Sequence, residues 1–436
     1  MLWLPSLQKL KLAAKTRRRR WKQRAARLLL FVGLIFVLTA ASVAPQSDLM
    51  VQVNRLTAGE QFDFVDWISL AAANEIERRV WPPAIPASNA DQRAVVETYI
   101  RQEDDIRRLE QAINKIYASA GSQAGQRAAE PEQEVAALKQ QQAKLLPQVE
   151  TIISRQIEAV LRSEGFGLDG QVLPPVAFRL VDAPTALILS PRDKIERKYF
   201  VGLSPGLDPA ERSRIEDALQ QRGDISAYVT DVGGLGSYPT MVVGSAWLPW
   251  LIDTTAHEWV HNYLYTFPTN IAWGYGSSHQ LTTVNETTAS LVGQEVSHKV
   301  IERFYPDWVN KLPPLDEHGQ PQPDEPSEFQ LAMRAIRRHV DELLAAGQVD
   351  QAETYMENER QKLVSKGYNL RRLNQAYFAF HGSYALSPGS IDPTGPQLRQ
   401  LRARAAGLKA FLDRVGWLNS DADYQSWLHE NNIPTK

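Results

Sequence analysis

The segment Thr255–His261 constrains this chain of 436 residues more than any other, because it contains the pattern H-E-x-x-H. Residues four apart share one face of an α-helix, so His257 and His261 are expected to point the same way. Two imidazoles placed like this can bind one Zn²⁺, while the adjacent Glu258 can activate a metal-bound water. The plain alternative is a solvated helical face that carries two of the chain's 8 histidines.

A zinc-binding helix of this kind must be half-buried, so that its ligands are held rigidly while the metal still reaches water. Trp259, Val260 and Leu264 supply apolar surface that would bury the rest of the helix. Asp253 or Thr254 is expected to cap its start, because short polar side chains accept hydrogen bonds from the first free amides. The sequence therefore predicts that the motif lies on a helix beginning near these two residues.

Zinc hydrolases usually have a third protein ligand and leave one position open for water. The candidate is Glu286, which lies 25 residues after His261 in a helix-compatible segment that ends near Tyr305. One side of that segment is apolar, at Leu291, Val292, Val296, Val300, Ile301 and Phe304. A second helix is therefore expected to present Glu286 to the metal. Taken alone, Glu286 would be an ordinary surface carboxylate.

The motif His257–His261, followed by Asn285–Ala289 with the sequence N-E-T-T-A, resembles the gluzincin metallopeptidases. These are thermolysin-like proteases and zinc aminopeptidases, and the chain is most similar to membrane-anchored aminopeptidases of bacteria. The resemblance covers roughly residues 225 to 305 and, at its widest, extends to about 385. It implies that His257, His261 and Glu286 bind one zinc ion, that Glu258 is the general base, and that the substrate is a peptide or protein.

Two features depart from these relatives. Thermolysin-like proteins carry an Asp four residues after the ligand Glu, where it orients a zinc-binding histidine, and here that position is Ser290. Ser290, a backbone carbonyl or another carboxylate must then fix the imidazole. Aminopeptidases also need an acidic anchor for the substrate's amine, and Gly244–Trp247 ahead of the motif contains no acid. Exo- and endopeptidase activity both stay open.

Peptide hydrolysis also needs a donor for the developing oxyanion. The aromatic-rich segment 374–384 supplies the candidates, with Tyr384 first and His381 second, since gluzincin relatives use a downstream Tyr or His in this role. The alternative is an aromatic stripe on a core helix.

The relatives also pair extended substrate with an edge strand ahead of the motif helix, a position that corresponds here to 238–244. Backbone pairing of this kind holds a peptide without reading most of its side chains. Tyr238, Met241 and Val243 are therefore the candidate substrate-binding residues, and a plain sheet edge is the alternative.

The N-terminus predicts a membrane location. Residues 1–27 contain ten basic residues and no acidic one, and residues 28–44 are almost entirely apolar. Such a run is at the short end of what spans a bilayer, and the basic side is expected in the cytoplasm. The interpretation is a single-pass anchor at the cell membrane with an extracytoplasmic catalytic domain. A cleaved signal peptide is the alternative, since Ser42–Ala44 resembles a cleavage site.

Composition excludes other classes. Beyond residue 27 the remaining 38 basic residues face 50 acidic ones, so this part carries a charge of −12 and has no basic patch for nucleic acid. The chain has 0 cysteines, which excludes disulfides and cysteine-containing zinc sites.

The rest of the chain divides by its pattern. Residues 45–90 form a juxtamembrane region, and 91–165 read as a helical hairpin, because apolar residues recur there at spacings of three and four. Residues 166–305 hold a β region and the zinc-binding helices, and 306–436 are a helical C-terminal part. The expected fold class is α+β, predominantly α: an anchor, a long hairpin, and a small β-sheet packed on a helical zinc-peptidase core.

The sequence thus favours a membrane-anchored zinc metallopeptidase in which zinc-bound water attacks a peptide bond. The alternative is a membrane-tethered scaffold with a structural or inactive zinc site. In that case the hairpin 91–165 would bind a protein partner. A structural zinc site is usually closed by four protein ligands, and only three are apparent here, which favours catalysis.

Overall fold

The computed structural model describes residues 48–119, 124–266, 271–275, 278–323, 325–382, 384–386 and 390–435. They fall into two compact units, one ending at Leu56 and the other beginning at Thr57. The first unit contributes helix α2 (Asp48–Leu56). The segments 1–27 and 28–44, for which a basic region and an anchor are expected, lie outside the described residues. Of the helices that are described, none combines the length and apolarity needed to cross a bilayer.

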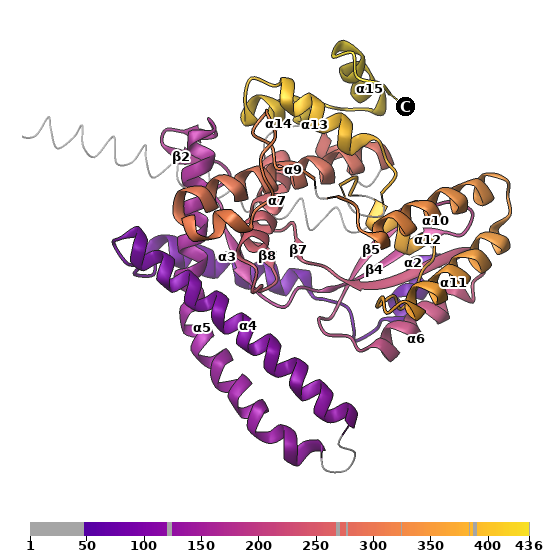
Figure 1. Cartoon of the computed structure of the whole chain (residues 1–436), viewed down its shortest axis with the longest axis horizontal. Helices are drawn as coiled ribbons and strands as arrows, with labels where there is room; N and C mark the ends of the chain where they lie inside the picture. The colour runs from indigo at the N-terminus through magenta and orange to yellow at the C-terminus, as the bar shows by residue number, and fades with distance from the viewer. Residues whose placement is uncertain are drawn as a thin grey trace, which may run out of the picture. The chain divides into compact units, whose positions relative to one another are not determined.

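The hairpin predicted for 91–165 is present as two long helices, α4 (Asn89–Ser119) and α5 (Ala124–Ser163), which pack along each other (Figure 1). The α5 helix continues through Pro131 and Pro147. At its base the hairpin joins the main core, where residues such as Tyr99 and Ile153 are buried. The hairpin is therefore part of the second unit's packed core at one end.

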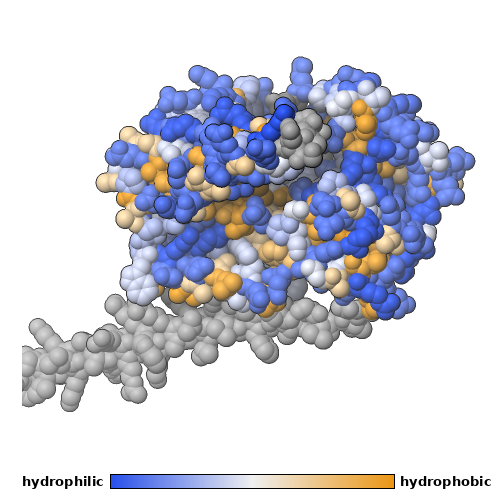
Figure 2. Space-filling model, turned by 90° about the horizontal axis from the view of Figure 1, so that it is seen from below, coloured by the Kyte–Doolittle hydropathy of each residue, from blue (hydrophilic) through white to orange (hydrophobic). Residues whose placement is uncertain are grey.

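Helix α3 (Phe64–Val80) has a side-chain cap from Asp63 and is attached to this base by charged residues. Arg78 pairs with the buried Glu150 of α5, and Glu75 pairs with Arg179 at 2.7 Å. Its outward side carries exposed apolar residues, among them Leu70 and Val80. On the face shown in Figure 2, hydrophobic residues appear in small groups between hydrophilic ones.

The β region forms three small sheets in the described part of the chain, where a single sheet was expected. In the first, β8 (Thr240–Val242) lies between β3 (Phe178–Leu180), which is parallel to it, and β7 (Gly234–Leu235), which is antiparallel. The second is antiparallel in the order β5-β4-β6, with strands Tyr199–Leu203, Thr185–Pro191 and Ile225–Asp231. The third pairs β1 (Gly167–Leu168) with β2 (Gln171–Val172).

This topology corrects two expectations. The strand-like runs 228–232 and 238–243, which flank the glycine-rich segment 233–236, are expected from the sequence to form a hairpin. That expectation is wrong, because β6 and β8 belong to different sheets. The expectation that 238–244 is an edge strand is also wrong, because β8 is hydrogen-bonded on both sides. The edge strands of that sheet are β3 and β7. Strand β7 has only two residues, which is too short to show an alternating pattern in the sequence.

The motif helix is α7 (Leu248–Thr266), and it packs along α9 (His279–Phe304), with the short α8 (Ile271–Gly274) between them in sequence. The expected cap at Asp253 or Thr254 is wrong, since α7 begins earlier and both residues lie inside it. The apolar run 248–252 forms the first turns, where Leu248, Leu251 and Ile252 are buried. The second predicted helix is confirmed and starts at His279.

The remaining elements are mostly helical. They are α6 (Pro209–Gln220), η2 (Pro306–Lys311), α10 (Glu328–Ala345), α11 (Val349–Ser365), α12 (Gln375–Gly382), α13 (Thr394–Arg404), α14 (Leu408–Gly416) and α15 (Asp421–Glu430). Helix α12 packs on β4 and β6, and α13 packs on α9. The fold is α+β and mainly α, as predicted, and one continuous core runs from the hairpin base through α7 and α9 to α14 and α15.

Candidate metal centre

Helices α7 and α9 approach closely because Gly293 has no side chain. A β-carbon at Gly293 would lie 2.4 Å from Oδ1 of Asp253, 2.9 Å from its backbone oxygen and 3.3 Å from Cβ of His257. These distances are too short for any other residue, so glycine permits the contact. The close approach brings the histidine face of α7 against Glu286 of α9.

The three predicted ligands converge. Nε2 of His257 and Nε2 of His261 are 3.2 Å apart, and Oε2 of Glu286 lies 3.5 Å from each of them. The nearest point equidistant from three atoms with these separations lies about 2.0 Å from each, and points just out of their plane lie slightly farther, which spans the usual zinc–nitrogen and zinc–oxygen distances. These residues therefore form a group that can hold a metal ion.

The surroundings of Glu286, the acidic member of the three, also suit a bound metal ion. Oε2 of Glu286 is buried and accepts no hydrogen bond, which is costly for a carboxylate oxygen unless a cation is its partner. Burial raises the pKa of Glu286, but His261, His257 and Arg197 outweigh burial and hold it well below its usual range. Glu286 is therefore ionised, and the set of two imidazoles and one carboxylate is one that zinc takes.

Each histidine has a partner for its second ring nitrogen. Nδ1 of His261 is 2.9 Å from Oδ1 of Asn285, and Nδ1 of His257 is 3.4 Å from Oγ of Ser290. An Nδ1–H that donates to these oxygens leaves Nε2 free for a metal. Of the three kinds of partner expected for a zinc-binding histidine, Ser290 is the one that lies beside His257, at the longer of the two distances. Asn285 could have been found from the sequence, because it directly precedes the ligand Glu286.

The other oxygen of Glu286 is held by two residues that sequence reasoning missed. The hydroxyl of Tyr275 donates to Oε1, and Nη2 of Arg197 lies 3.9 Å from the same atom. Tyr275 follows α8, and Arg197 precedes β5. No sequence signal marks Arg197, which lies just before a strand of another sheet and 60 residues before the motif.

Glu258 faces the glycine-rich strand β7. It is buried, with 6% of its surface exposed, and burial raises its pKa. A β-carbon at Gly234 would lie 2.7 Å from its Oε1, and one at Gly236 would lie 3.4 Å from its Oε2. The carboxylate thus lies between α7 and the edge of the sheet, beside the three ligands.

The two candidate oxyanion donors, Tyr384 and His381, lie in different surroundings. Tyr384 lies at the site: its ring centroid is 6.2 Å from that of His257, and burial followed by Glu286 and Tyr275 raises its pKa far above the usual range. His381 instead packs in an aromatic cluster, with its ring centroid 4.3 Å from Tyr377. Burial there lowers the pKa of His381 to about 4.

The three candidate substrate residues occupy different surroundings. Met241 is fully buried in the central strand β8. The hydroxyl of Tyr238 accepts a hydrogen bond of 2.7 Å from Arg79 of α3, and the amide of Val243 donates to the carbonyl of Gly233. Strand β8 is thus not a sheet edge, and among the described strands β7 is the edge strand beside Glu258.

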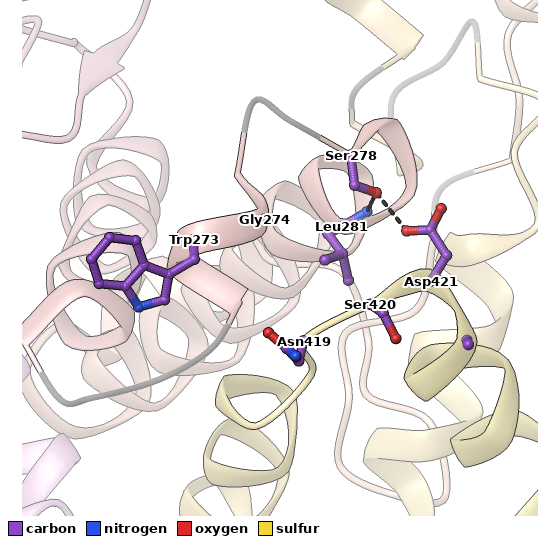
Figure 3. A pocket seen from close by; sticks show the side chains of 8 residues that line it. Trp273, Gly274, Ser278, Leu281, Asn419, Ser420 and Asp421 are labelled. Atoms are coloured by element: carbon purple, nitrogen blue, oxygen red, sulfur yellow. Dashed lines mark hydrogen bonds between the residues drawn. The ribbon is translucent and has the colours of Figure 1, made fainter.

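A pocket lies beside the start of α9, on residues outside the three-ligand group. It is lined by Trp273, Gly274, Ser278 and Leu281 on one side and by 419–422 on the other (Figure 3). The hydroxyl of Ser278 donates to Asp421 across it. This contact joins the start of α9 to the start of α15 and so supports the helix that carries Glu286.

Comparison with known proteins adds no assignment. No family model matches the chain, and no curated protein and no solved structure matches it.

Proposed function

We propose that this protein is a zinc-dependent peptidase of the gluzincin type. The observation that carries the proposal is the convergence of two histidine nitrogens and an unpartnered carboxylate oxygen, with Glu258 beside them. The group has three ligand residues among those described. Three ligands leave a position for water and so favour a catalytic site over a structural one.

A bound zinc would supply a water of lowered pKa and would polarise the substrate carbonyl. Glu258 is the general base: it takes the proton from the attacking water and passes it to the leaving amine. Burial raises the pKa of Glu258 above that of a free carboxylate, which is the direction that favours proton transfer near neutral pH. Tyr384 donates a hydrogen bond to the oxygen on which negative charge develops.

Substrate binding is proposed on the free edge of β7. An extended peptide that pairs there would run past Glu258, and its backbone would be held without much selection of side chains. The aminopeptidase function implied by the resemblance has no support from the segment 244–247, which contains no acid.

Membrane attachment is a separate proposal that rests on sequence alone. Residues 28–44 would anchor the chain and residues 1–27 would stay in the cytoplasm. A mature N-terminus near Pro45, found by mass spectrometry, would contradict an uncleaved anchor and indicate a signal peptide.

The function is tested by removing and restoring the metal. Purified protein is treated with a chelator, dialysed, and given one equivalent of Zn²⁺ before digestion of a peptide library, with the products read by mass spectrometry. We expect cleavage that disappears with the metal and returns with zinc. Cleavage that persists in metal-free protein would contradict the proposal.

A further inference from the structure

The carboxylate of Glu286 has two oxygens in different surroundings. Oε2 faces the two histidines at 3.5 Å each and has no hydrogen-bond donor. Oε1 accepts a hydrogen bond from the Tyr275 hydroxyl and lies 3.9 Å from the Arg197 guanidinium. A carboxylate that is free to rotate can bind a metal through one oxygen or through both. Here one oxygen is already occupied by protein groups.

The two residues that contact Oε1 also support each other. The guanidinium carbon of Arg197 lies 5.5 Å from the centroid of the Tyr275 ring, within the range of a cation–π contact. The Arg197 side chain is only 11% exposed, so its planar group has little freedom. Tyr275 contacts the metal group as well, since its ring centroid is 6.0 Å from that of His261. The pair therefore forms a rigid wall behind Glu286.

We infer that Tyr275 and Arg197 are positioning residues that reserve Oε1 of Glu286, so that Glu286 binds the metal through Oε2 alone. The inference rests on the proposed metal site. Binding through one oxygen keeps the protein's contribution at three donor atoms and leaves room for water and substrate. Neither residue touches the reacting atoms; both act through Glu286.

The Tyr275→Phe variant removes the hydroxyl and keeps the ring that packs on Arg197. The matched control is Tyr265→Phe, at the exposed end of α7, where the tyrosine is 59% exposed. The first readout is the Zn²⁺ dissociation constant, measured by competition with a chelating dye. The second is the visible absorption of protein loaded with Co²⁺, whose intensity falls as coordination rises from four to five.

We expect Tyr275→Phe to weaken zinc binding by about 10- to 100-fold, the usual loss when a partner of a metal ligand is removed. Its cobalt spectrum should become weaker, because the freed Oε1 joins the metal. Tyr265→Phe should match the wild type in both. Arg197→Lys should keep more of the zinc affinity than Arg197→Gln, because a cation still faces Oε1.

A double variant distinguishes a positioning role, which acts through Glu286, from a general effect on the stability of the protein. In a Glu286→Gln background, Tyr275→Phe should cause no further loss of zinc affinity. A zinc affinity and a cobalt spectrum unchanged by Tyr275→Phe would overturn the inference, and so would an equal loss in the Glu286→Gln background. If the Tyr275→Phe variant does not fold, the two Arg197 variants provide the test. Equal zinc affinity of Arg197→Lys and Arg197→Gln would then overturn the inference. A wild type that binds no cobalt refutes the metal site itself.

Discussion

Gly234 of β7 lies against the carboxylate of Glu258 on α7, with no space for a side chain between them. A β-carbon at Gly234 would be 2.7 Å from Oε1 and 3.1 Å from Cγ of Glu258, and 3.0 Å from Cγ2 of Thr254. The position of the proposed general base is therefore set partly by the absence of atoms on the neighbouring strand. This contact joins the sheet edge, where substrate is proposed to bind, to the group proposed to move the proton.

Gly234→Ala should displace Glu258 and lower the turnover number by about 10- to 100-fold, since a shift near 1 Å in a catalytic group can cost this much. Zinc content should not change, because Gly234 has no contact with the three ligands among its nearest atoms. Steady-state kinetics and metal analysis check both statements. Gly407→Ala is the control, as its β-carbon would meet no atom within 4 Å. Equal turnover of the Gly234→Ala variant and the wild type would refute the displacement.

Gly293→Ala tests the contact between the two motif helices. The added methyl group would lie 2.4 Å from Oδ1 and 2.9 Å from the backbone oxygen of Asp253, so α7 and α9 must separate. Overpacking of this kind usually costs about 1–3 kcal/mol. We expect a lower melting temperature and weaker zinc binding together, measured by calorimetry and chelator competition. A variant with wild-type zinc affinity would show that the helix contact does not set the ligand geometry.

Tyr384→Phe should lower turnover by about 10²- to 10³-fold at constant zinc content, because the donor to the oxyanion is lost. His381→Phe is the informative comparison. His381 packs among aromatic rings and is expected to keep turnover near the wild-type value. The Tyr384 assignment would be refuted by unchanged turnover in the Tyr384→Phe variant.

Zinc affinity should depend on pH above neutrality. Burial alone would lower the pKa of His261 in the metal-free site, but Glu286 and Glu258, together with Asn285, raise it to about 9. Below that pH the ring holds a proton that zinc must displace. Apparent zinc affinity should therefore fall about tenfold for each unit as pH decreases from 9 toward 7. Competition titrations measure this slope, and an affinity constant between pH 7 and pH 9 would contradict it.

The local parts of the fold and site could be predicted from the sequence. The spacing of His257 and His261 required a helix, and the apolar side of the segment after Glu286 required another. The expectation that these two helices meet followed from the third protein ligand that a catalytic zinc site needs. The hairpin was equally visible, because long amphipathic helices repeat their pattern many times.

The parts that failed depend on contacts between distant segments. Strand order decided that β8 is central and that β3 and β7 are the edges, and strands of two or three residues carry too little pattern to reveal their partners. Arg197 reaches Glu286 only because the segment just before β5 comes close to that residue of α9 in space. His381 and Tyr384 lie three residues apart, and tertiary packing alone decides which one faces the metal group. The start of α7 was misplaced because its buried first turns carry few polar residues to mark a helix.

The most direct test of the central claim compares the wild type with Glu258→Gln, both loaded with zinc, in a peptide-library digest read by mass spectrometry. Glutamine keeps the shape of the side chain and cannot accept the proton. The account predicts one bound zinc in each protein, new peptide termini with the wild type, and at least about a 10²-fold loss of cleavage in the variant. Equal cleavage by both proteins, or no cleavage by a wild type that holds one zinc, would contradict it.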